Sequence, residues 1–250
     1  TTPVGKLLQN LNNVKNPVVL LSTGGFLPIH EGHINMMELA KAHLEKLGCT
    51  VLGGYFSPSH EDYVSTKPYY SSTLGQRIID CQNTVENSNW LMIDTWESIY
   101  VKSYINFTSV IDRLEKYLQL HVDKRIKVAY VFGADNAYFN YCFEEDGIGI
   151  CINRNTKSED FYSAKAKIIS KNCIFIENFD ESFKLSSRFI RNKEDNNNNV
   201  SSKLEGNFLI RDEELLPFDN FLKLVNKDNL EKARQTFKTG LIKLYQKEFG

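Results

Sequence analysis

The segment from Val18 to Ala40 constrains the fold of this chain more than any other. It begins with an apolar run, Val18 to Leu21, which is typical of a strand buried on both faces in a parallel sheet. Gly24 and Gly25 follow, where backbone can approach a ligand without a Cβ in the way. The spacing of apolar residues then becomes helical. A strand, a glycine turn and a helix start together predict an anion-binding site.

Two histidines, His30 and His33, lie three residues apart near the expected helix start. At this spacing both imidazoles can face one bound group and donate hydrogen bonds to phosphate oxygens. Taken alone, the two histidines are also compatible with a surface pair or a fragment of a metal site. The full string Gly-Gly-Phe-x-Pro-x-His-x-Gly-His, which includes Phe26, is more specific. It resembles the signature of the adenylyl- and cytidylyltransferase superfamily, in which the two histidines bind the phosphates of a nucleoside triphosphate.

The length of the chain, with no internal repeat and no convincing linker, predicts a single domain over residues 1–250. A net charge of −1 gives no indication of nucleic acid or a membrane surface as a partner. No apolar run approaches the roughly 20 residues of a membrane span, and residues 1–16 lack a signal-peptide pattern. The scattered cysteines favour free buried thiols in a reducing compartment over disulfides or zinc ligands. They are Cys49, Cys81, Cys142, Cys151 and Cys173.

Apolar runs alternate with helical patterns, which predicts a Rossmann-like, doubly wound parallel sheet with helices on both faces. Strands are expected near 18–21, 50–57, 90–94, 127–132, 149–152 and 174–176, and helices near 34–47, 73–85, 107–118 and 161–169. Residues 58–72 read as a polar loop. The asparagine-rich segment 192–207 is predicted to be a mobile surface loop, and 208–250 to form a helical C-terminal part.

A second group of candidate residues is Ser186, Ser187, Arg188 and Arg191. The serines can cap a short helix, and two arginines three residues apart share a face that can grip phosphate oxygens. Alone, this pattern is equally typical of a phosphate-binding helix and of an ordinary capped surface helix. The superfamily, however, closes its triphosphate site with a Ser-Ser-x-x-Ile-Arg segment. The resemblance therefore implies ATP binding by the first three residues and a catalytic role for Arg191.

A third group, Gly133-Ala134-Asp135, follows the expected strand at 127–132. In a parallel sheet, ligands bind beyond the carboxyl ends of the strands, where Gly24 and Gly133 both fall. Asp135 can accept hydrogen bonds from ribose hydroxyls there, or it can simply cap the following turn.

Most of the chain is similar to the eukaryotic nicotinamide/nicotinate mononucleotide adenylyltransferases. The resemblance rests on the histidine motif, on Ser57-Pro58 with Asp62-Tyr63, on the string Asp94 to Ser98, on Gly133 to Asp135, and on Ser186 to Arg191. It implies an enzyme that joins ATP and the mononucleotide to give NAD, or its deamido form, and pyrophosphate. It also implies Mg²⁺ carried on the ATP rather than held by side chains of the protein. His30, His33 and Arg191 are then catalytic, and Gly24, Gly25, Phe26, Gly133, Asp135, Ser186, Ser187 and Arg188 bind ATP.

The pyridine nucleotide is expected to contact Tyr63, Lys67, Trp96, Tyr104 and Thr108. This half of the site departs from the family, because residues 136–146 form a shorter segment that has no tryptophan. Two alternatives therefore stay open: nucleotidyl transfer to another phosphorylated acceptor, and nucleotide binding without turnover. The sequence favours a cytoplasmic location and does not exclude the nucleus. It is also compatible with a homo-oligomer.

Overall fold

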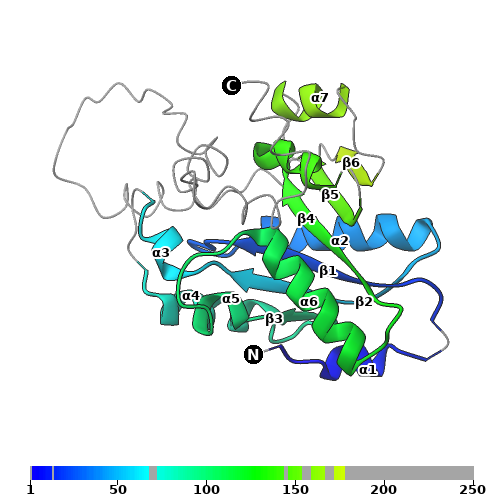
Figure 1. The fold of residues 1–250 in the computed structure, drawn as a ribbon, viewed down its shortest axis with the longest axis horizontal. Coiled ribbons are helices and arrows are strands. Elements are labelled where there is room, and N and C mark those ends of the chain that lie inside the picture. The colour runs from blue at the N-terminus through cyan, green and yellow to red at the C-terminus, as the bar shows by residue number, and fades with distance from the viewer. Residues whose placement is uncertain are drawn as a thin grey trace.

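The computed structural model describes residues 2–12, 14–67, 72–143, 146–153, 159–166 and 172–177. Within this part, parallel strands form one sheet in the order β3-β2-β1-β4-β5-β6 (Figure 1). The strands are β1 (Pro17–Gly24), β2 (Thr50–Pro58), β3 (Leu91–Ile93), β4 (Lys127–Gly133), β5 (Ile148–Asn153) and β6 (Cys173–Glu177). The parallel pairing and the strand order confirm the predicted Rossmann-like α/β class.

Helices cover both faces of the sheet, with α6 in front of it and α2 behind it in Figure 1. The helices are α1 (Gly5–Gln9), α2 (Glu31–Lys46), α3 (Glu61–Val64), α4 (Leu74–Val85), α5 (Trp96–Ile99), α6 (Phe107–His121), the 3₁₀ segment η1 (Ala134–Phe143) and α7 (Glu159–Ala166). Apolar side chains of α2 and α4 pack in the core on one face. Those of α1, α6, η1 and α7 pack in the core on the other.

Strand β1 supplies side chains to both cores. Val18 and Leu20 belong to the core that contains α2, whereas Val19 and Leu21 belong to the core that contains α6. All four are at most 3% exposed. This alternation is the geometry of a strand whose successive side chains point to opposite faces. It confirms that the run is buried on both faces.

The chain order places a topological switch between β1 and β4. The chain runs from β1 outward to β2 and β3, then returns to the other side of β1 as β4. Leu21 pairs with Tyr130 across these two strands, and the Thr23 and Tyr130 hydroxyls are 2.8 Å apart. Gly24 and Gly133, which end the strands, therefore lie at the same edge of the sheet, where such folds bind ligands.

Several predicted boundaries are wrong. Helix α2 begins at Glu31 rather than near residue 34, because His30 caps it. The expected polar loop at 58–72 contains helix α3, and the segment after Gly133 forms η1. Helix α7 begins at Glu159, two residues before the predicted start at 161. Trp90 precedes β3 and is buried in the core, in agreement with its interpretation as a core aromatic.

The five cysteines are free thiols, as predicted, although Cys49 and Cys173 are half-buried rather than buried. In the described part of the chain, no helix combines the length and the apolar character needed to cross a bilayer. The predicted loop at 192–207 and the helical C-terminal part at 208–250 lie outside the described residues.

Candidate functional site

The turn after β1 is buried and tightly folded. Gly25 and Phe26 connect the end of β1 to the segment that leads into α2. Phe26 has a φ of +47°, a left-handed conformation that is uncommon for a residue other than glycine. Its ring contacts His33 and Phe56 edge to face, with centroid distances of 5.2 and 5.5 Å. These contacts hold the strained residue between α2 and β2 and keep the turn beside the histidine pair.

The two histidines cap helix α2 reciprocally. The Gly32 N–H donates to His30 Nδ1 at 3.0 Å, and the His30 N–H donates to His33 Nδ1 at 3.2 Å. The ring centroids are 3.9 Å apart. Because Nδ1 of each ring accepts a hydrogen bond, Nε2 is the ring nitrogen that can donate one to a bound group. The structure thus brings both imidazoles together at the start of a helix, as the spacing predicts.

Gly133 and Asp135 lie at the end of the neighbouring strand. Asp135 is exposed, and its Oδ1 lies too close to Gly133 for a Cβ to be added there without a clash. The same missing Cβ would lie 3.8 Å from Met36 Sδ of α2, so this strand end adjoins the helix that the histidines cap. An exposed carboxylate at such an edge can accept hydrogen bonds from hydroxyl groups.

Tyr63, Tyr104 and Lys67 gather beside the glycine turn. The two tyrosine rings stack with centroids 5.0 Å apart and an interplanar angle of 18°. Lys67 Nζ lies 4.7 Å from the Tyr63 ring centroid and 3.4 Å from where a Cβ on Gly25 would be. Burial raises the pKa of the Tyr63 hydroxyl to about 12, so this hydroxyl stays protonated at neutral pH. Two flat aromatic surfaces and a cation therefore adjoin the turn.

Trp96 occupies a neighbouring cluster built on a buried carboxylate. Asp94 accepts hydrogen bonds from Thr2 Oγ1 at 2.7 Å, from Arg113 Nη1 at 3.0 Å and from the Trp96 N–H at 3.3 Å. The Arg113 guanidinium lies 4.9 Å from the Trp96 ring centroid. Burial raises the pKa of Asp94, and the Arg113 charge opposes this shift. The cluster fixes the indole ring between β3 and α6.

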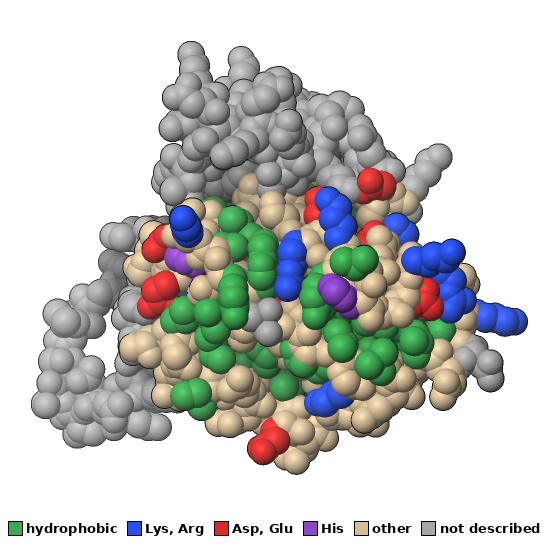
Figure 2. Space-filling view, turned by 60° about the horizontal axis from the view of Figure 1, so that its bottom comes forward, with side chains coloured by type: hydrophobic (Ala, Val, Ile, Leu, Met, Phe, Trp, Pro, Cys, Tyr) green, Lys and Arg blue, Asp and Glu red, His purple; other side chains and the backbone are tan. Residues whose placement is uncertain are grey.

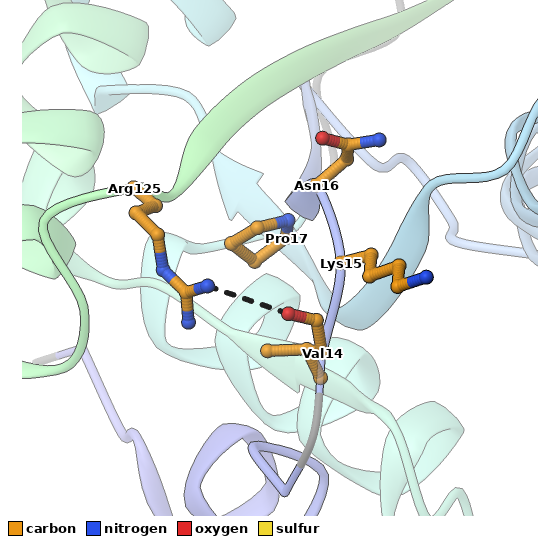
Figure 3. A pocket seen from close by; sticks show the side chains of 5 residues that line it. All are labelled: Val14, Lys15, Asn16, Pro17 and Arg125. Carbon is orange, nitrogen blue, oxygen red and sulfur yellow. Dashed lines mark hydrogen bonds between the residues drawn. The ribbon is translucent and has the colours of Figure 1, made fainter.

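Thr108 is buried near the start of α6. It lines a hollow of about 400 Å³ together with Ile111, Cys142 and Phe143, and neither tyrosine lines that hollow. Another hollow, of about 440 Å³, lies at the opposite end of β1, where Pro17 begins the strand (Figure 3). It is lined by Val14, Lys15, Asn16, Pro17 and Arg125. Neither hollow contains the glycine turn.

Two buried ionisable residues at this site, Arg77 and Glu97, are absent from the predicted set. Arg77 is a buried residue of α4, together with Cys81 and Val85. Its guanidinium donates to the carbonyl groups of Gly25 and Ser59. The signal in the sequence is its spacing, because Arg77 precedes Cys81 and Val85 by four and eight residues, on one helix face.

Glu97 lies on α5 and is 2% exposed. Its carboxyl accepts hydrogen bonds from Ser57 Oγ at 3.3 Å and from the His60 N–H at 3.4 Å. Burial raises its pKa to about 8, although these hydrogen bonds lower it. Glu97 therefore braces the carboxyl end of β2 close to the tyrosine pair.

The described residues include no cluster of three His, Cys, Asp or Glu side chains suited to a metal ion. On the face shown in Figure 2, acidic, basic, histidine and hydrophobic side chains are interspersed. The candidate residues Ser186, Ser187, Arg188 and Arg191 lie outside the described residues.

Comparison with known proteins identifies relatives of the same kind as the motifs suggest. The chain is 43% identical over 86 residues to nicotinamide/nicotinic acid mononucleotide adenylyltransferase 2 of Danio rerio. The aligned region covers 34% of this chain and 27% of that protein. It is 29% identical over 188 residues to nicotinamide/nicotinic acid mononucleotide adenylyltransferase of Arabidopsis thaliana, covering 68% and 76% of the two chains. It is 36% identical over 100 residues to the protein of that name from Oryza sativa subsp. japonica, covering 40% and 39%.

The chain spans about a quarter of the length of the vertebrate relatives that it matches. Together, these relatives confirm the resemblance that the motifs predict. The match to the cytidylyltransferase-like family runs over residues 21–203, which is more than half of the chain. The chain therefore belongs to the cytidylyltransferase-like family.

Proposed function

We propose that this protein is an adenylyltransferase that joins ATP and nicotinamide or nicotinate mononucleotide. One observation supports the proposal most strongly. His30 and His33 together cap the start of α2, beside the glycine turn at the switch point of the sheet. The names of the relatives from Danio rerio and Arabidopsis thaliana support the choice of substrates. MgATP and the mononucleotide are then the two substrates, and Mg²⁺ enters with the triphosphate.

In the proposed reaction, a 5′-phosphate oxygen of the mononucleotide attacks the α-phosphorus of ATP. The new P–O bond gives NAD, or its deamido form, and the bond to the β-phosphate breaks to release pyrophosphate. Negative charge builds on the oxygens around the α-phosphorus in the transition state, so fixed donors stabilise it. His30 and His33 supply such donors through Nε2, and the start of α2 adds its positive end. Arg191 is proposed to hold the leaving pyrophosphate.

The remaining proposed contacts divide between the two substrates. Asp135 is proposed to accept hydrogen bonds from the adenosine ribose, because it lies exposed beyond β4 next to the histidine-capped helix. The stacked Tyr63 and Tyr104 rings offer a flat surface to the pyridine ring. Lys67 lies between that surface and Gly25, where it can neutralise the attacking phosphate.

The decisive experiment incubates the protein with ATP, Mg²⁺ and nicotinamide mononucleotide and measures NAD and pyrophosphate. Formation of both products in equal amounts supports the proposal. Pyrophosphate released only with another phosphorylated acceptor would replace the substrate but keep the reaction class. Binding of ATP with no pyrophosphate from any acceptor would leave a nucleotide-binding protein.

We further propose the cytoplasm as the compartment, an inference from the sequence that localisation of a tagged protein tests. Light scattering of the purified protein decides between a monomer and a homo-oligomer.

A further inference from the structure

Arg77 is a buried positive charge directly behind the glycine turn. Its side chain is 0% exposed. Nη1 donates to the carbonyl oxygens of Gly25 at 3.1 Å and Ser59 at 3.0 Å, and Nη2 donates to the Glu61 carboxylate at 2.8 Å. Removing a guanidinium from water costs several kcal/mol unless acceptors surround it. Here, two of its acceptors are main-chain carbonyls at the ends of the strands that carry the site.

The contact with Gly25 fixes the orientation of one peptide group. The Gly25 carbonyl and the Phe26 N–H belong to the same peptide unit, and in a planar trans peptide they point in opposite directions. Because Arg77 holds the carbonyl on the inner side of the turn, the Phe26 N–H is directed to the other side. Among the described residues, no backbone carbonyl accepts a hydrogen bond from this N–H.

The same guanidinium also joins β1 to β2. The Ser59 N–H donates to the Gly24 carbonyl at 2.9 Å, and the Ser59 carbonyl accepts from Arg77. The turn is therefore held from inside by one cation, while Lys67 Nζ, from the segment after α3, lies next to Gly25. Any anion bound at the turn lies close to both cations, and the Glu61 carboxylate offsets part of the Arg77 charge.

We propose that Arg77 is a positioning residue for a bound polyphosphate. It holds the Gly25 carbonyl inward so that the Phe26 N–H can donate to a phosphate oxygen, and its charge lies behind that donor. This inference rests on the proposed function only in requiring a polyphosphate at the turn. The identity of the acceptor substrate does not enter it.

The test replaces Arg77 with Lys and measures the binding of inorganic tripolyphosphate and of nicotinamide mononucleotide by calorimetry. An ammonium group keeps the charge but cannot serve both carbonyl groups as the planar guanidinium does. We expect R77K to bind tripolyphosphate about tenfold more weakly, the loss of roughly one charge-assisted hydrogen bond. Mononucleotide binding should change less than about threefold, and far-ultraviolet circular dichroism should be unchanged.

Glu61→Gln is the matched control, because it removes the ion pair and leaves both carbonyl contacts of Arg77 in place. E61Q should bind tripolyphosphate within about twofold of the unmodified protein. A folded R77K with unchanged tripolyphosphate affinity would overturn the proposal. So would an equal loss in R77K and E61Q, or an equal loss for both ligands, since each would indicate a general structural role.

A measurement on the unmodified protein decides the matter if R77K fails to fold. The Phe26 amide proton should move downfield on titration with tripolyphosphate, and an unmoved resonance would overturn the proposal. Tripolyphosphate binding that weakens in R77K, in a protein that makes no NAD, would leave this inference standing while the proposed function fails. If the protein makes NAD and R77K binds tripolyphosphate as tightly as the unmodified protein does, the proposed function stands and this inference fails.

Discussion

Glu97→Gln tests whether the protein keeps an uncharged carboxyl group beside its tyrosine pair. Glu97 is 2% exposed, and its carboxyl accepts hydrogen bonds from two uncharged donors, the Ser57 hydroxyl and the His60 N–H. Burial is the largest cause that raises its pKa from the ordinary 4.5 to about 8. Glutamine preserves the size of the side chain and an oxygen acceptor for the two donors. The substitution therefore removes the ionisation and little else.

The sign of the effect follows from where the proton resides. Between pH 4.5 and about 8 the folded protein retains a proton on Glu97 that the unfolded chain loses. The free energy of unfolding consequently falls as the pH rises, by about 1.4 kcal/mol per pH unit. The contribution of neutral Glu97 is fully present below pH 4.5 and is lost above about pH 8, a total of at most about 5 kcal/mol. E97Q does not carry this loss.

Denaturation by urea and by heat, at pH 6 and pH 8, measures the difference. Relative to the unmodified protein, E97Q should gain about 2 kcal/mol between these two conditions, or about 4–8 °C in Tm. The exposed Glu86 at the end of α4 provides the control, because E86Q should run parallel to the unmodified protein. Parallel curves for E97Q across pH 5 to 9 would refute the argument that Glu97 is held neutral.

Three further changes probe the site and the sheet. His33→Ala should lower kcat by about 10²- to 10³-fold while changing ATP binding far less, because its contact strengthens as charge builds in the transition state; steady-state kinetics with ATP titration checks this, and equal losses would count against the role. Tyr104→Ala should raise KM for the mononucleotide about five- to tenfold through lost stacking and leave KM for ATP nearly unchanged; an unaltered mononucleotide KM would remove Tyr104 from the site. Gly54→Ala should destabilise the fold by about 1–3 kcal/mol, because the new Cβ would lie 2.8 Å from Met37 Cε and 2.9 Å from Trp90 Cζ3; an unchanged urea midpoint would contradict this packing argument.

The framework of the fold was predictable because it depends on local periodicity. The apolar run at 18–21 has to be covered on two sides, and helical patterns on either side of it supply the cover. The chain order then brings Gly24 and Gly133 to one edge. Boundaries were less predictable where a side chain caps its own helix. The motif predicts His30 as a phosphate ligand, whereas the structure shows it as the cap that starts α2 at Glu31, earlier than the apolar pattern indicates.

The support of the site was harder to predict because it consists of contacts between side chains and distant backbone. Arg77 holds a carbonyl 52 residues away, and Glu97 accepts from an N–H 37 residues away. A sequence pattern gives the type and spacing of side chains. It cannot indicate which backbone group a buried charge will contact, because nearly every residue carries the same carbonyl and N–H. The motif residues and their buried supports therefore differ in kind. The first are recognisable from what they can do to a phosphate, whereas the second become recognisable only once the sheet has brought their partners close.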